Sequence, residues 1–277
     1  MDILWGGVTD MCEQDILQAA EMMTGAKRVA VLTGAGISAE SGVPTFRGKD
    51  GLWKQYRAES LATPEAFERD PALVWEWYDW RRGIVSRVSP NPGHSVLAEW
   101  ERFFPHLTII TQNVDGLHAK AGSKKIIELH GNIWKLRCTR ENTISLDLNS
   151  PLPKIPPICP VCQSILRPHV VWFGESLDPE VISEAFRLCG EAEVVLVVGT
   201  SAVVYPAAAL PGAASEAGAK IIEINPDPTP LTSAADISLR GKAGEILPLL
   251  DIRLRGEQPG SLREENPDKP NGKDDPS

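Results

Sequence analysis

A glycine-rich segment near the start of the chain has the spacing of a nucleotide-binding turn. An apolar run at 28–32 indicates a buried strand, and Gly34-x-Gly36-x-x-Ala39 follows it. Such glycines let the backbone turn tightly against a pyrophosphate at a helix N-terminus. We therefore predict that main-chain N–H groups of this turn bind the phosphates of a dinucleotide. The residues in contact are expected to be Gly34, Ala35, Gly36 and Ser38. The alternative is a glycine turn that only packs a helix against a strand.

The segment after this turn argues against a hydride-transfer enzyme. A dehydrogenase needs a second strand that ends in an acidic residue about 20 positions further on, where it holds the adenosine ribose. Here the residues from Pro44 to Trp53 are loop-like and aromatic instead. We expect Asn225, which ends an apolar run at 220–224, to contact the ribose in its place. The alternative role of Asn225 is to form a turn before Pro226.

Further polar residues follow other short apolar runs. Gln112, Asn113 and Asp115 come after residues 107–111, and Gly199, Thr200 and Ser201 come after residues 194–198. The hydroxyl groups can bind a phosphate or a ribose, or they can cap a helix. Because ligands of open α/β sheets bind at the carboxyl ends of the strands, we expect these side chains to meet at one edge of a sheet.

His130 is the candidate catalytic base. It follows the strand-like residues 126–129, and an imidazole can accept a proton near neutral pH. The alternative is a core histidine held by hydrogen bonds. Of the other histidines, His94 is typical of a helix start, whereas we expect His118 and His169 to be buried and hydrogen-bonded.

Strands alternate with helices along most of the chain. We predict strands at 28–32, 107–111, 126–129, 169–173, 194–198, 220–224 and 236–239, and helices at 13–23, 71–85, 94–103 and 244–250. This alternation predicts an α/β fold with a Rossmann-like parallel sheet that is covered on both faces. Residues 40–88 contain no convincing strand. Residues 132–169 are rich in proline, cysteine and polar side chains, which indicates a smaller inserted module.

The same pattern divides the chain into three parts. Residues 1–12 are an N-terminal extension, residues 13–255 form the catalytic domain, and residues 256–277 are expected to be a disordered tail. Within the domain, the Rossmann-like parts are about 13–40, 90–131 and 169–255, and the small-module insertions are about 41–89 and 132–168.

Several blocks of the sequence, taken together, resemble a known family. The residues at 34–48 read GAGISAESGVPTFRG, which resembles the signature of the sirtuins, the NAD-dependent protein-lysine deacylases. Further blocks match in the same order: Thr111 to Asp115, Leu129 to Gly131, Val171 to Glu175, Gly199 to Ser201, and Asn225. The resemblance covers nearly all of residues 15–252. It implies that NAD is a consumed co-substrate and that acyl-lysine proteins bind as extended peptides.

The resemblance also implies a mechanism. The carbonyl oxygen of an acylated lysine attacks the ribose carbon that carries nicotinamide, and nicotinamide leaves. His130 then deprotonates a ribose hydroxyl, which attacks the acyl carbon, and water gives free lysine and O-acyl-ADP-ribose. Asn113 and Asp115 are the other catalytic residues implied. The NAD-binding residues implied are Gly34, Ala35, Gly36, Ser38, Glu40, Thr45, Phe46, Arg47, Trp53, Gln112, Asn113, Asp115, Gly199, Thr200, Ser201, Asn225, Pro226, Asp227 and Ala243.

Tyr78 and Arg81 indicate which acyl group the protein prefers. They are spaced i, i+3 on the predicted helix 71–85 and share one of its faces. A phenol and a guanidinium can together grip a carboxylate. By resemblance, this Tyr-x-x-Arg lies where class III sirtuins recognise succinyl, malonyl or glutaryl groups. The alternative is an aromatic core face with surface arginines, and Arg82 would point elsewhere on the helix.

The resemblance places the substrate peptide between two segments, 171–175 and 203–205. We expect both to be extended, so that strand addition binds many sequences with little selectivity. Two ordinary buried strands are the alternative. The substrate-binding residues implied are Tyr78, Arg81, Val171, Phe173, Gly174 and Glu175.

The cysteines depart from the family pattern. Sirtuins commonly bind zinc with two Cys-x-x-Cys pairs, but this chain has Cys159-x-x-Cys162 and only Cys138 of the other pair. Three thiolates with Glu141 or a water could hold zinc, although structural zinc sites prefer four Cys or His ligands. A metal-free module held by packing is the alternative.

Composition limits the class of protein. Of 277 residues, 42% are hydrophobic and 23% are charged, and the net charge of −9 argues against a dedicated nucleic-acid binder. No apolar stretch has the length of a membrane span, no secretory signal is evident, and five cysteines suit a reducing cytoplasm. We expect a cytoplasmic desuccinylase or demalonylase with some deacetylase activity. The alternatives are a plain deacetylase, a mono-ADP-ribosyltransferase and an NAD-sensing binding module.

Overall fold

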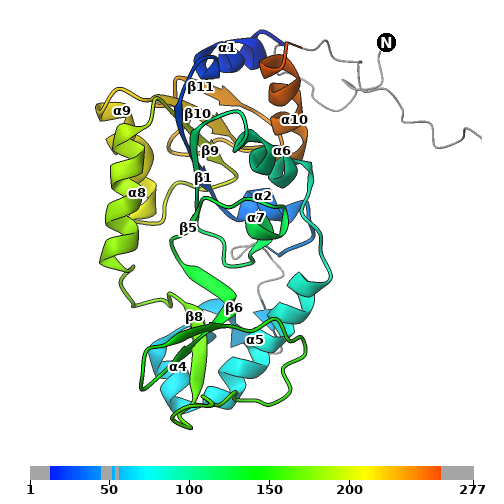
Figure 1. Cartoon of the computed structure of the whole chain (residues 1–277), viewed down its shortest axis with the longest axis vertical. Coiled ribbons are helices and arrows are strands. Elements are labelled where there is room, and N and C mark those ends of the chain that lie inside the picture. Colours follow the sequence, from blue (N-terminus) through cyan, green and yellow to red (C-terminus); the bar gives the residue numbers. More distant parts are fainter. Residues whose placement is uncertain (1–12, 45–51, 54–55, 257–277) are drawn as a thin grey trace, which may run out of the picture.

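A six-stranded parallel sheet forms the larger part of the molecule (Figure 1). The computed structural model describes residues 13–44, 52–53 and 56–256. The proposed extension 1–12 and all but Gly256 of the proposed tail lie outside this range. The strand order is β11-β10-β9-β1-β4-β5, so the direction of winding reverses between β1 and β9. The strands are β1 (Arg28–Thr33), β4 (His106–Thr111), β5 (Ile126–Glu128), β9 (Val194–Val198), β10 (Lys220–Ile224) and β11 (Ile237–Leu239). The prediction of a Rossmann-like parallel sheet is confirmed.

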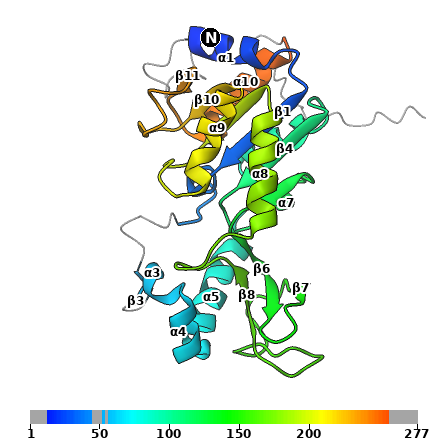
Figure 2. The ribbon, with the colours of Figure 1, turned by 90° about the vertical axis from the view of Figure 1, so that its left-hand side faces the viewer.

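Helices cover both faces of this sheet, as Figures 1 and 2 show. Along β1, Val29 and Val31 pack into one core, whereas Ala30 and Leu32 pack into the other. The first core contains α1 (Glu13–Met23), α6 (Pro92–Trp100) and α10 (Ala243–Leu254). The second contains α8 (Pro179–Glu191), the helical turn Ala207–Ala209 and α9 (Leu210–Glu216). Side chains of successive residues in a strand point to opposite faces, so an apolar strand feeds two cores at once.

A smaller module lies at the other end of the molecule (Figures 1 and 2). Its three-stranded antiparallel sheet has the order β7-β6-β8, with β6 (Gly131–Cys138), β7 (Ile144–Leu146) and β8 (Leu166–Val170). The helices α4 (Pro64–Arg69) and α5 (Pro71–Ser86) pack on it through a third core, which is rich in aromatic side chains. The remaining elements are α2 (Ala35–Ala39), β2 (Leu52–Trp53), β3 (Tyr56–Arg57), α3 (Ala58–Leu61) and α7 (Leu117–Lys120).

Three sequence predictions about elements are wrong. The strand predicted at 169–173 is β8 at Leu166–Val170, and it pairs with β6 in the small sheet because Leu166, Pro168 and Val170 alternate into the core. A short antiparallel pair, β2 and β3, lies in the 40–88 region, where the sequence predicts no strand. The helix predicted at 94–103 is α6 at Pro92–Trp100. It begins earlier than predicted because Asn91 accepts a hydrogen bond from the main chain of His94 and caps the helix.

No helix within the described ranges is both long and apolar enough to span a bilayer.

Two glycine loops touch where the strand order reverses. The N–H group of Gly36, after β1, donates a hydrogen bond to the carbonyl oxygen of Gly199, after β9, at 2.8 Å. A Cβ atom at Gly36 would lie 2.7 Å from the Gly199 main chain, and one at Gly199 would lie 2.5 Å from the Ile37 nitrogen. Gly199 also has a φ of +59°, which side chains disfavour. The two loops can approach this closely only because both residues are glycine.

We expect Gly199→Ala to lower the free energy of unfolding by about 1–3 kcal/mol, because it adds both a steric conflict and backbone strain. Gly190→Ala is the matched control, since a methyl group added at Gly190, in α8, would meet no other part of the protein within 4 Å. Urea unfolding of both variants measures the difference. Equal stability of the two variants would show that the contact is not tight.

Candidate active site

The polar residues predicted to meet at one edge do so, at the carboxyl ends of the parallel strands. Asn113 Nδ2 donates to the Gly34 carbonyl oxygen at 2.9 Å and to Ser38 Oγ at 3.2 Å. Gln112 Nε2 donates to Thr200 Oγ1 at 2.9 Å. These contacts join the loops that follow β1, β4 and β9, which is where ligands of doubly wound sheets bind.

The glycine turn contributes differently from the prediction. The N–H groups of Gly34 and Gly36 donate to the carbonyl oxygens of Val198 and Gly199. They are therefore engaged within the protein rather than open to a phosphate. Ala35 begins α2, and Ser38 is buried within this helix. Because the N–H groups of Gly34 and Gly36 already have partners, any phosphate at this turn must be bound by other donors.

His130 lies between β5 and β6 with its imidazole held by the main chain. Its Nδ1 atom lies 2.9 Å from the carbonyl oxygen of Gln112. Because a carbonyl only accepts hydrogen bonds, Nδ1 carries the proton and Nε2 keeps its lone pair. Burial lowers the pKa of His130 below its usual value, although the bond to Gln112 opposes this effect. The imidazole is therefore a neutral base at physiological pH.

Asp115 is a buried carboxyl group on the same loop as Asn113. Its Oδ1 atom accepts a hydrogen bond from the Leu117 N–H at 2.8 Å, and its carbonyl oxygen accepts one from Trp134 Nε1 at 2.8 Å. Burial raises the pKa of Asp115, whereas the hydrogen bonds to it and the nearby Arg81 lower it. Asp115 thus joins the sheet edge to the small module.

Tyr78 and Arg81 lie on α5 in the small module, close enough to interact electrostatically. Tyr78 Oη accepts a hydrogen bond from Trp172 Nε1 at 2.9 Å, which leaves the phenol proton for another partner. Burial raises the pKa of Tyr78 to about 12, so the phenol stays protonated. The Arg81 guanidinium lies over the Trp77 ring, 5.0 Å from its centroid.

Arg82 points away from this pair, as the sequence predicts. Its Nη2 atom bonds Asp147 Oδ1 at 2.6 Å, and its guanidinium lies 4.9 Å from the centroid of the Trp134 ring. Arg82 therefore ties α5 to the segment that follows β7 and contributes to the small module rather than to the Tyr78–Arg81 pair.

The two predicted peptide-binding segments, 171–175 and 203–205, are not strands in the structure. The N–H groups of Val171 and Phe173 donate to the carbonyl oxygens of His130 and Ala62, so these donors already have partners. Strand addition through those two N–H groups is therefore excluded in this conformation. Phe173 is 51% exposed and its side chain is accessible, and Gly174 has open space around its Cα.

Glu175 is engaged within the protein. Both of its oxygens bond the Arg167 guanidinium, at 2.6 and 2.8 Å, and Oε2 also accepts the Trp172 N–H. These bonds and the charge of Arg167 hold the pKa of Glu175 below its usual value despite burial. Glu175 therefore positions Trp172, the partner of Tyr78, and its contact with substrate stays a prediction.

Other predicted cofactor residues lie around the same edge. Glu40 Oε2 accepts the Gly244 N–H at 2.7 Å, next to Ala243 at the start of α10. Asn225 Nδ2 donates to the Thr200 carbonyl oxygen at 2.9 Å, with Pro226 and the exposed Asp227 following it, and Ser201 is exposed. Thr45, Phe46 and Arg47 lie outside the described residues, as does the side chain of Trp53.

Two histidines form a buried pair beneath the edge. The rings of His94 and His118 lie 4.9 Å apart between centroids. Burial lowers the pKa of His94 to about 4 and that of His118 to about 3. His118 Nε2 lies 3.0 Å from Thr33 Oγ1, which donates to Thr111 Oγ1. The sequence marks Thr111 only as the first residue of a matching block and does not mark Thr33 at all, since each threonine simply ends an apolar strand.

The three predicted cysteine ligands come together. The sulfur atoms of Cys138, Cys159 and Cys162 all lie within 4.8 Å of one another, and Cys138 and Cys162 are 3.3 Å apart. Hydrogen bonds from Ser164 lower the pKa of Cys162 to about 7. Three soft thiolates suit zinc, but no described carboxylate or imidazole completes the cluster, Glu141 included. The donor set fits zinc with one coordination position left to a water or another ligand.

Comparisons with known proteins agree on one family. A sequence profile described as the Sir2 family matches residues 34–206. An NAD-dependent protein deacylase of Aquifex aeolicus is 59% identical over 215 residues, which span 78% of this chain and 90% of that protein. A solved complex of a Sir2 homolog with NAD is 51% identical, covers 86% of this chain and 93% of its own, and has a TM-score of 0.81. A Sir2 protein bound to a myristoylated histone peptide is 36% identical, with coverages of 88% and 98% and a TM-score of 0.71.

We expect Glu141→Cys to tighten zinc binding, because it completes a second Cys-x-x-Cys with Cys138 and supplies the fourth thiolate. Competition with a chromophoric zinc chelator measures the affinity of the variant and of the unchanged chain. Glu141→Ser is the control, because it removes the same carboxylate without adding a thiol. Equal affinity in both variants would mean that the fourth position is out of reach of residue 141.

Proposed function

We propose that this chain, which belongs to the Sir2 family, removes acyl groups from protein lysines at the expense of NAD. The observation that carries this proposal is the neutral His130 imidazole, which the Gln112 carbonyl holds at the edge formed by the carboxyl ends of the parallel strands. A base with a free Nε2 lone pair at this edge suits proton removal from a bound ribose. The relatives named above include an NAD-dependent protein deacylase and an NAD complex.

In the proposed reaction, an acyl-lysine carbonyl oxygen attacks the ribose carbon of NAD and nicotinamide leaves. His130 Nε2 accepts the proton of a ribose hydroxyl, and the resulting oxygen attacks the acyl carbon. Water then releases free lysine and O-acyl-ADP-ribose. Asn113 and Asp115 are proposed to orient the nicotinamide half, since both belong to the loop after β4 that also contacts Gly34.

The finer proposal concerns the acyl group. Tyr78 offers a protonated phenol and Arg81 a guanidinium with several N–H donors, and the two lie on one face of α5. Together they can bind a terminal carboxylate with charge-assisted hydrogen bonds. We therefore propose succinyl-lysine and malonyl-lysine as preferred substrates, with acetyl-lysine accepted more slowly. A relative binds a myristoylated histone peptide, which supports an acylated peptide as the general form of the substrate.

Arg81→Met is expected to lower the kcat/KM for a succinyl-lysine peptide by about tenfold or more, because a charged hydrogen bond to the acyl carboxylate is lost. Its rate with the matched acetyl-lysine peptide should stay unchanged. Arg87→Met, an exposed change at the end of the same helix, is the control. Mass spectrometry of both peptides gives the initial rates. A parallel fall with both peptides would assign Arg81 a structural role only.

The pH dependence of deacylation should reflect His130. The base acts when unprotonated, and burial lowers its pKa from 6.5, so kcat/KM should fall only below that pH. We expect the midpoint of the acid limb below pH 6.5 in a peptide deacylation assay, and the same profile for His106→Gln, whose side chain is exposed. A midpoint above pH 6.5 would contradict this assignment.

A further inference from the structure

Glu223 is a buried carboxylate between two buried isoleucines of a strand. It lies in β10, where Ile222 and Ile224 pack into the core that contains α1, α6 and α10. Glu223 alternates with them and points to the opposite face, yet only 1% of it is exposed. A buried carboxylate is costly unless donors surround it, so its partners show what it does.

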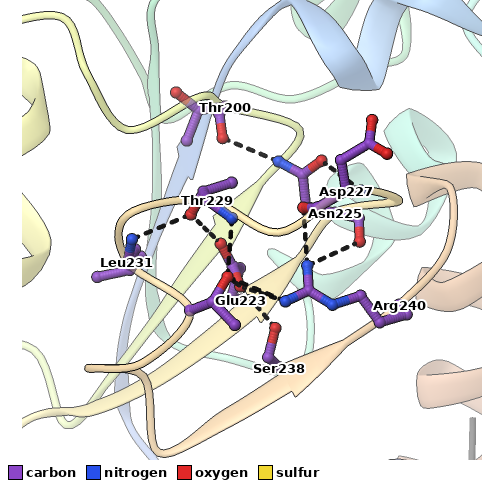
Figure 3. A network of polar contacts seen from close by, with 9 residues as sticks. Thr200, Glu223, Asn225, Asp227, Thr229, Leu231, Ser238 and Arg240 are labelled. Atoms are coloured by element: carbon purple, nitrogen blue, oxygen red, sulfur yellow. Dashed lines mark hydrogen bonds and ion pairs between the residues drawn. The ribbon is translucent and has the colours of Figure 1, made fainter.

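The donors come from one segment, residues 229–240 (Figure 3). Thr229 Oγ1 donates to Glu223 Oε1. Glu223 Oε2 accepts from Thr232 Oγ1 at 2.7 Å and from Ser238 Oγ at 2.5 Å, and the Arg240 guanidinium lies 3.5 Å from it. The carboxylate therefore holds the middle of the segment between β10 and β11, at Thr229 and Thr232, close to Ser238 in β11 and to Arg240 after it.

Arg240 also binds the first residues after β10, Asn225 and Asp227. Its Nη1 atom donates to the carbonyl oxygens of Asp227 at 2.7 Å and Asn225 at 3.5 Å, as Figure 3 shows. Its Nη2 atom donates to Thr232 Oγ1 at 2.9 Å. One guanidinium thus links the buried carboxylate to the main chain at Asn225 and Asp227.

The segment between β10 and β11, residues 225–236, contacts the edge of the sheet where the candidate active site lies. Asn225 Nδ2 donates to the Thr200 carbonyl oxygen, and Thr200 Oγ1 accepts from Gln112. Residues 226–228 are exposed, and of residues 225–236 only Leu231 and Ala235 pack against the core, both of them partly buried. Because this segment buries so little apolar surface, its hydrogen bonds and ion pairs are what hold it in a single conformation.

We infer that Glu223 is a positioning residue for NAD: through Arg240 and the threonines, it fixes the loop at 225–232 that receives the adenosine end of the dinucleotide. This inference rests on the proposed function. Glu223 contacts no substrate itself, because Thr229, Thr232 and Ser238 enclose it. Its effect should therefore fall on NAD binding and leave the chemistry at His130 unchanged.

Glu223→Gln tests this inference. Calorimetric titration should show NAD binding about tenfold weaker, and the KM for NAD should rise similarly, while kcat at saturating NAD stays unchanged. Glu193→Gln is the matched control. Glu193 Oε2 accepts the N–H groups of Lys27 and Arg28 at the opposite edge of the sheet, so its loss should leave the KM for NAD unchanged.

Thr232→Val is a milder second variant that keeps the side-chain shape and removes one hydroxyl, in case Glu223→Gln does not fold. It should raise the KM for NAD in the same direction, and amides at 225–232 should exchange hydrogen faster while those of β9 do not change. The inference is overturned if the unchanged chain binds NAD and both variants bind it equally well. If Glu223→Gln is unfolded, equal NAD binding by Thr232→Val alone overturns it. It is also overturned if kcat falls with no change in KM. Failure of the unchanged chain to bind NAD would instead overturn the proposed function, and this inference with it.

Discussion

The main-chain contact between Gly36 and Gly199 sets the distance between the two loops on either side of the strand reversal. Since neither position has room for a Cβ atom, the loops after β1 and β9 pack backbone to backbone. Asn113 can then reach the Gly34 carbonyl oxygen, and Gln112 can reach Thr200. The glycines here act mainly by allowing close packing, because their own N–H groups are used within the protein.

Two sets of hydrogen bonds connect these loops to the rest of the site. On one side, the Gln112 carbonyl holds His130, and Asp115 accepts a hydrogen bond from Trp134 of the small module, near Tyr78 and Arg81. On the other side, Thr200 joins Asn225 and the segment organised by Glu223. The co-substrate and the acyl-lysine are thereby proposed to meet between two units whose cores are separate.

The sequence predicts the parallel sheet well because fully buried parallel strands are short apolar runs, as in β9. It misplaces β8 because Arg167 and His169 alternate with buried residues and hide the strand, whereas the apolar run that follows it is a loop. It places His130 and Asn113 correctly at strand ends, since that edge follows from the topology. It could not reveal the partners of Glu175 and Glu223, because these depend on how distant segments fold back, and strand periodicity carries no such information.

The most direct test of this account is a product analysis of the purified chain with NAD and a succinyl-lysine peptide. Mass spectrometry would quantify nicotinamide, the free-lysine peptide and O-succinyl-ADP-ribose together. For the unchanged chain the account predicts equal amounts of all three products, formed only when NAD and the peptide are both present. From His130→Ala it predicts neither the free-lysine peptide nor O-succinyl-ADP-ribose, because the steps after nicotinamide release need the base. For the unchanged chain, nicotinamide release with an unaltered peptide, or ADP-ribose attached to the protein, would contradict it.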